Sequence, residues 1–139
     1  MKYSELVQAY FDRSTALQWY WTIYIIVIGG VLAFSSFRQH KDVLVTILVT
    51  ALYGCFAYKN LGAIEATIVE RQAILGEIKA YPTSTADPAN LASLRQKLEP
   101  ALVSQEPADI HNFHLVCDLM TIAAIWVKEF RRKKPEPST

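Results

Sequence analysis

The chain has 139 residues, of which 52% are apolar and 19% are charged, and its formal net charge is +1. An apolar content this high excludes intrinsic disorder. A charge balance this close to neutral gives no overall field that would attract nucleic acid, so nucleic acid is not expected as a partner. The apolar residues are gathered into blocks separated by polar connectors, which predicts one domain with membrane-spanning segments.

Residues 1–13 predict an amphipathic helix. Their apolar side chains follow the spacing of one helix face, with Leu6 and Tyr10 one turn apart. The two tyrosines and the phenylalanine of this face suit a helix that lies at the membrane surface among the lipid headgroups. The alternative is a short helix that packs on the rest of the protein.

The next segment, residues 14–37, is a run of 24 residues in which tyrosines are the only ionisable groups. At about 1.5 Å per residue, a helix of this length measures roughly 36 Å, which is enough to cross a bilayer core of about 30 Å. The run is too long for a cleaved signal peptide, so we expect an uncleaved signal anchor. Trp19, Tyr20 and Trp21 near its start are expected to anchor the helix at the membrane interface.

A second apolar run, residues 43–58, follows after only five residues, a length that returns the chain beside itself as an antiparallel helical pair. Gly29 and Gly30 of the first run are expected to face it, because small residues let membrane helices approach closely. The second run gives only about 24 Å of helix, so it spans the bilayer only if the helix continues. Residues 14–58 therefore predict a transmembrane hairpin, and one helix is expected over 43–80.

Residues 59–106 are expected to form a helical connector outside the membrane. Prolines and a Ser/Thr cluster predict a loop over residues 81–88, and Asp87 followed by Pro88 is a typical helix start. The long second helix carries an apolar stripe with alternating spacings of three and four residues. The stripe is formed by Leu61, Ile64, Ile68, Leu75 and Ile78. It is able to contact a partner, a second copy, or the chain's own helices.

A third transmembrane helix with a basic end is predicted over residues 107–134. It carries His111, His114 and Asp118, whose offsets of 0, 3 and 7 place them on one helix face. Within a bilayer, Asp118 has to be paired, protonated or in contact with water. Its nearest partner is His114, one helical turn earlier.

The leading interpretation of this polar face is a structural network that forms hydrogen bonds with Tyr24, Thr46 or Tyr53 of the hairpin. Proton or ion conduction is an alternative. A metal site is not expected, because metal binding needs about four ligands and the hairpin offers no further His, Asp or Glu at that depth. Haem is not expected either, because both histidines lie on one helix, so no cofactor is predicted.

The carboxyl-terminal part of this helix is basic, with five Lys or Arg among residues 128–134. The expected membrane anchors at this end are Trp126, Arg131, Arg132, Lys133 and Lys134. Such a run is typical of the cytoplasmic end of a span and attracts anionic lipid. Residues 135–139 are expected to be a disordered tail. We expect an integral protein of a plasma or inner membrane, with the amino end outside and the carboxyl end cytoplasmic.

Taken together, these segments predict an all-α integral membrane protein with three transmembrane helices, the second of them long and projecting into solvent. No nucleophile–base pair or phosphate-binding loop stands out, so an enzyme is not the first expectation. The expected function is assembly, as an accessory subunit of a membrane complex or as a homo-oligomer, with membrane lipid and other membrane subunits as partners. The alternatives are an oligomeric channel or transporter that uses His114 and Asp118, and an intramembrane enzyme acting on lipid or quinone.

Overall fold

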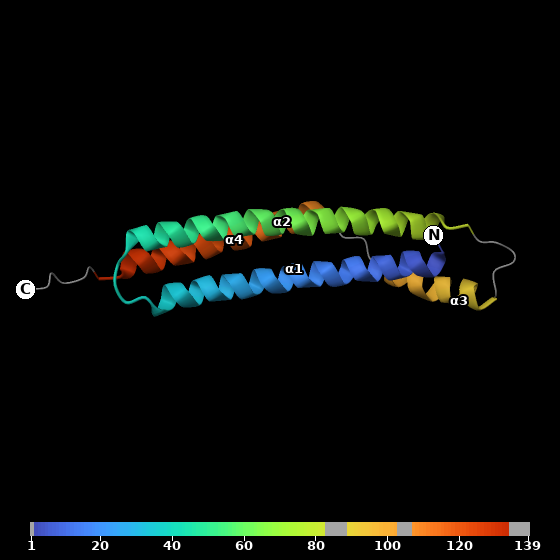
Figure 1. The fold of residues 1–139 in the computed structure, drawn as a ribbon, viewed down its shortest axis with the longest axis horizontal. Coiled ribbons are helices and arrows are strands. Elements are labelled where there is room, and N and C mark those ends of the chain that lie inside the picture. The colour runs from blue at the N-terminus through green and yellow to red at the C-terminus, as the bar shows by residue number, and fades with distance from the viewer. Residues whose placement is uncertain (1, 83–88, 103–106, 134–139) are drawn as a thin grey trace, which may run out of the picture.

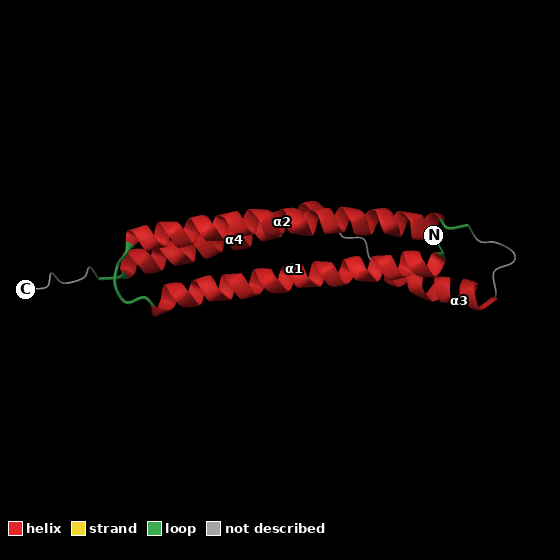
Figure 2. Cartoon of the chain, in the orientation of Figure 1, coloured by secondary structure: helices red, strands yellow, loops and turns green. Residues whose placement is uncertain are grey.

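The structure is a computed structural model that describes residues 2–82, 89–102 and 107–133. Its elements are α1 (Tyr3–Phe37), α2 (Val43–Ala80), α3 (Ala89–Leu98), the 3-10 helix η1 (Glu99–Ala101) and α4 (Pro107–Arg131). The described residues include no strand, as Figure 2 shows. The all-α prediction is therefore confirmed, and α1, α2 and α4 are each long and apolar enough to cross a membrane.

The helices form an elongated bundle in which α1 and α2 run antiparallel along nearly the whole length (Figure 1). α4 packs on both of them in the half that contains the turn at residues 38–42, and α3 lies near the start of α1 at the opposite end. The turn and the carboxyl end of α4 therefore share one end of the bundle. The amino terminus and the connector share the other, as three spans require. Which end faces the cytoplasm stays a prediction.

Local sequence accounts for where the helices begin. The Glu5 carboxylate accepts a hydrogen bond from the backbone N–H of Lys2 at 2.8 Å, at the start of α1. Asp42 caps α2 by accepting from the backbone N–H of Val45 at 3.1 Å. Pro107 is the first residue of α4, where a missing N–H costs no helical hydrogen bond.

The first residues of the chain are not a separate element but the first turns of α1. Most of their apolar face is buried against α2 and the end of the connector, in a cluster of Tyr3, Leu6, Tyr10, Leu75, Ile78 and Leu102. Phe11 of that face is 47% exposed. The Arg95 guanidinium of α3 lies 5.1 Å from the centre of the Tyr3 ring. The amphipathic pattern of residues 1–13 thus serves packing within the chain, which is the alternative that the sequence left open.

The apolar stripe of α2 is also covered by this chain. Ile64 and Ile68 pack against α1, and Leu75 and Ile78 belong to the cluster at its start. These four side chains are between 0% and 4% exposed, and Leu61 is half-buried. The helix over residues 43–80 is confirmed, and α1 accompanies it beyond the second apolar run.

This packing predicts a large effect of Ile78→Ala, because Ile78 is completely buried. Truncation of a buried isoleucine leaves a cavity and costs about 2–5 kcal/mol. We expect faster amide hydrogen exchange in residues 3–13, measured by mass spectrometry, because their partner surface is lost. Val69→Ala, at a position 58% exposed on the same helix, is the matched control. Equal exchange in both variants would contradict the packing of the first turns on α2.

The half of the bundle where three helices meet has apolar side chains outside and polar side chains inside, the reverse of a water-soluble protein. We call it the membrane half (residues 18–37, 43–60 and 111–131). Large apolar side chains are exposed there: Ile25, Ile26, Leu44 and Leu52 are each 63% to 76% exposed. The buried polar side chains are Ser35, Thr46, Asn60, His114, Thr121 and Glu129. An apolar exterior around a hydrogen-bonded polar interior suits a surrounding lipid, and it supports an integral membrane protein.

Candidate functional site

A single carboxylate joins the three helices of the membrane half. Asp118 Oδ1 accepts hydrogen bonds from the hydroxyl groups of Tyr24 in α1, at 2.8 Å, and Tyr53 in α2, at 2.7 Å. Asp118 Oδ2 lies 2.8 Å from Nδ1 of His114, on the preceding turn of α4. We call these residues, together with Asn60, the Asp118 cluster. A carboxylate that accepts three hydrogen bonds is well compensated for leaving water.

His114 is fully buried within this cluster. Its ring stacks on the ring of Tyr24, with 4.1 Å between the centroids. Its Nε2 lies 3.5 Å from the side-chain amide nitrogen of Asn60. In the tautomer that donates from Nδ1 to Asp118, Nε2 is the acceptor for the Asn60 amide, so both ring nitrogens are used.

The chemistry of the Asp118 cluster is therefore that of a closed hydrogen-bond network. Each polar side chain forms a hydrogen bond with another member. The His114 ring is covered on one face by Tyr24. Such a network fixes the rotation and register of the helices that supply it. This geometry favours the structural interpretation of the polar face. Of the three hairpin residues considered as partners, Tyr24 and Tyr53 bind Asp118, whereas Thr46 lies in a different cluster.

His111 does not join the Asp118 cluster. It lies one turn before His114, and its Nδ1 is 2.7 Å from a carboxylate oxygen of Glu65 in α2. Both side chains are exposed, at 51% and 38%. Within the described part of the chain, no group of three or more His, Cys, Asp or Glu is arranged to hold a metal ion.

A second polar cluster closes the end of the bundle that contains the turn. Glu129 of α4 is fully buried. Its Oε1 accepts from the backbone N–H of Asp42 at 2.7 Å. Its Oε2 pairs with Arg132 and lies 3.7 Å from Nη1 of Arg38. Arg38 also donates to the Thr46 hydroxyl at 2.9 Å. This Glu129 cluster ties the end of α1, the start of α2 and the end of α4 together.

An apolar residue separates the two clusters along α4. Ile125 is 2% exposed and lies between Thr121 and Glu129 at spacings of one helical turn. A side chain without donors or acceptors interrupts a chain of hydrogen bonds. Its position argues against a continuous proton path through one copy of the bundle.

The aromatic residues predicted as interface anchors lie on the outside or the edge of the bundle. Trp19 is 62% exposed. Tyr20 and Trp21 are half-buried against the cluster of Ile64 and Ile68. Trp126, near the other end, is half-buried with its ring 5.6 Å from that of Phe130.

The basic residues at the end of α4 differ in their surroundings. Arg131 and Lys133 are exposed, as an anchor in the lipid headgroup region requires. Arg132 is not a simple surface charge, because its side chain is only 8% exposed and pairs with Glu129. Lys134 and the tail expected at 135–139 lie outside the described residues.

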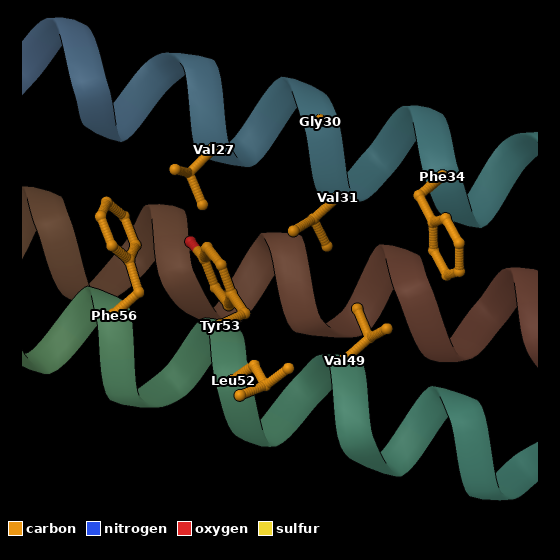
Figure 3. A pocket seen from close by; sticks show the side chains of 8 residues that line it. All are labelled: Val27, Gly30, Val31, Phe34, Val49, Leu52, Tyr53 and Phe56. Carbon is orange, nitrogen blue, oxygen red and sulfur yellow. The ribbon is translucent and has the colours of Figure 1, made fainter.

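An apolar groove of about 350 Å³ opens between α1 and α2 in the membrane half, with α4 behind it (Figure 3). It is lined by Val27, Gly30, Val31, Phe34, Val49, Leu52, Tyr53 and Phe56. A Cβ added at Gly29 or Gly30 would meet no neighbouring atom within 4 Å. Gly30 therefore borders the groove beside α2 without a close helix contact, and that both glycines face α2 stays a prediction.

The sequence interpretation did not include Asn60 or Glu129. Asn60 follows Lys59, and its position at the end of the apolar run made it part of the connector. Glu129 lies within the basic segment at the end of α4, where the cations dominate the pattern. Its signal was its spacing, because it is the only acidic residue of that segment and lies three residues before Arg132.

Comparison with known protein families, with curated proteins and with solved structures finds no match to this chain. A proposal for the function of this chain therefore rests on its sequence and structure.

Proposed function

We propose that this protein is a non-catalytic membrane subunit that binds a helix of a different membrane protein along the outer face of α2. The observation that carries this proposal is that α2 has two largely apolar faces beyond the membrane half, the second of them without any charged residue. One face is buried against α1. The opposite face is exposed and consists of Gly62, Ala66, Val69, Ala73, Gly76 and Ala80.

We call this second set the outer α2 face. Its residues recur at spacings of three and four, directly opposite Ile64, Ile68 and Ile78. A helix with water on one side normally carries charged residues there, whereas a helix packed on both sides is apolar on both. Glycine and alanine also allow another helix to approach closely. The outer α2 face therefore has the composition of a packing surface.

Charges beside the outer α2 face favour a different protein over a second copy packed in parallel. Glu70 and Glu77 lie along one edge, and Glu65, Gln72 and Lys79 lie along the other. When two identical helices pack in parallel, the edge with Glu65 of one copy faces the edge with Glu70 of the other. Each residue then lies near the partner residue whose number is five higher. Glu65 would then oppose a second Glu70. Glu70 already pairs with Arg13 of α1 at 3.2 Å. A partner helix with Lys or Arg opposite Glu77 avoids the repulsion and gains an ion pair.

The partner is expected to be a membrane protein as well. The uncharged side of α2 continues from Gly62 into the membrane half through Cys55 and Ala51, both exposed. A helix that follows the outer α2 face over its length therefore enters the lipid beside α2. This geometry supports an accessory or scaffold subunit.

The test is the composition of the complex extracted from its native membrane in lipid particles. We expect a defined hetero-complex, with a photo-crosslinking residue at Ala66 joining this chain of 15.7 kDa to one membrane protein. Ala73→Glu is expected to weaken the purified complex by about 100-fold or more, because a charge enters an apolar interface. Gln8→Glu, at an exposed position of α1, is the control and should leave the complex intact.

Two outcomes would contradict the proposal. A stable monomer in native lipid particles would show that the protein does not act by assembly. A crosslink only to a second copy would exclude the hetero-complex. Thermal unfolding of Ala73→Glu should match that of the parent chain, because Ala73 is exposed in the isolated protein.

A further inference from the structure

The end of the bundle that contains the turn has a pocket of about 280 Å³ between the last turns of α1 and α4. It is lined by four cationic side chains and two serines, namely Arg38, Lys128, Arg131, Arg132, Ser35 and Ser36. Glu129 is the one carboxylate that pairs with lining residues in the described chain. Four cations less one carboxylate leave the pocket with a charge of +3.

The four cations have two different roles. Arg38 and Arg132 are held by Glu129 and shape the inner wall. Lys128 is exposed and donates to the Ser36 hydroxyl. Arg131 is exposed as well, and it forms no ion pair among residues 2–82, 89–102 and 107–133. Lys128 and Arg131, three residues apart on α4, are therefore the cations that are available to an anion from outside.

An apolar trough of about 320 Å³ lies along the same seam between α1 and α4. It is lined by Ile28, Leu32, Cys117, Met120, Thr121 and Ala124. Leu32 lies one helical turn before Ser36, and Ala124 lies one turn before Lys128, so the trough leads along both helices to the cationic pocket. An apolar trough that ends in a cationic pocket matches the shape and polarity of a phospholipid.

We propose that the α1–α4 seam binds one anionic phospholipid, with its phosphate between Lys128 and Arg131 and an acyl chain along Leu32 and Ala124. Arginine binds phosphate oxygens in bidentate geometry, and basic pockets between transmembrane helices hold anionic headgroups. A zwitterionic lipid gains less, because its ammonium group is repelled by the charge of the pocket. The site lies on a different surface from the outer α2 face, so it is independent of the partner proposed there.

The experiment is native mass spectrometry of the full chain released from membranes that contain equal amounts of phosphatidylglycerol and phosphatidylcholine. We expect one phosphatidylglycerol to stay bound. The double variant Lys128→Gln, Arg131→Gln should weaken this binding roughly 30-fold, since each charge near the headgroup contributes about fivefold. The matched control is Lys41→Gln, Lys133→Gln, which removes two charges from the same end but none from the pocket. It should change binding less than about threefold.

A second arm separates the lipid from free phosphate. Ala124→Phe fills the trough and should lower retention of phosphatidylglycerol about 10-fold, as expected when a buried chain loses its contacts. If both double charge variants lose phosphatidylglycerol binding equally, the lipid is attracted by the overall charge of this end and not by the pocket, which would overturn the proposal. Equal retention of phosphatidylcholine would overturn it as well. Displacement of the lipid by inorganic phosphate at comparable concentration would show a phosphate site without a lipid.

Discussion

Glu129→Ala is expected to lower the free energy of unfolding by about 3–5 kcal/mol, the loss that follows when one partner of a buried ion pair is removed. The carboxylate is fully buried and satisfies Arg132, Arg38 and the backbone N–H of Asp42. Without it, two guanidinium groups that are only 16% and 8% exposed lose their counterion. Reversible unfolding in mixed micelles, with SDS as the denaturant, measures the difference.

The control for Glu129→Ala is Glu77→Ala, which removes the same side chain from an exposed position of α2. Its expected effect is below about 0.5 kcal/mol. Glu129→Gln should fall between the two, because the amide still accepts from the Asp42 N–H but no longer balances the two arginines. If Glu129→Ala unfolds like Glu77→Ala, the arginines reach water and the Glu129 cluster does not hold the end of the bundle.

The three long helices were predictable because their signals are local and extend over many residues. An uncharged run longer than the bilayer is thick, a short polar turn and a proline at residue 107 each indicate structure without knowledge of distant contacts. The role of residues 1–13 was not decided by sequence. Their apolar face suits a lipid surface or a protein surface equally well, and only the position of Leu75 and Ile78 in space distinguishes the two.

The polar interior was predictable only in part, for the same reason. The His114–Asp118 pair lies within one helix at a spacing of one turn, so sequence was sufficient to propose it. The partners on other helices depend on rotation about the helix axes. Tyr24 and Tyr53 turn toward Asp118, whereas Thr46 meets Arg38 near the other end.

Asp118→Leu is expected to lower the free energy of unfolding by about 2–5 kcal/mol, because three hydrogen-bond donors lose their acceptor. Each such hydrogen bond contributes about 0.6–1.7 kcal/mol in membrane proteins. The donors are the hydroxyl groups of Tyr24 and Tyr53 and Nδ1 of His114. The same titration in mixed micelles measures the loss.

Asp118→Asn provides the contrast, because an amide is able to replace the carboxylate in this network. Its oxygen still accepts from both tyrosines, while its NH₂ group donates to His114 Nδ1, whose proton moves to Nε2. Asn60 then turns its amide oxygen toward Nε2, so both ring nitrogens of His114 keep a partner. We expect a loss below about 1 kcal/mol for this variant.

The two Asp118 variants also distinguish a structural cluster from a conducting one. A structural cluster predicts that Asp118→Asn folds like the parent chain and that proton flux into proteoliposomes is the same for the two proteins. A conducting site predicts a stable Asp118→Asn protein with altered flux, because an amide does not carry a proton as a carboxylate does. A loss of stability in Asp118→Asn as large as that in Asp118→Leu would contradict the hydrogen-bond account and show that the negative charge itself holds His114 in place.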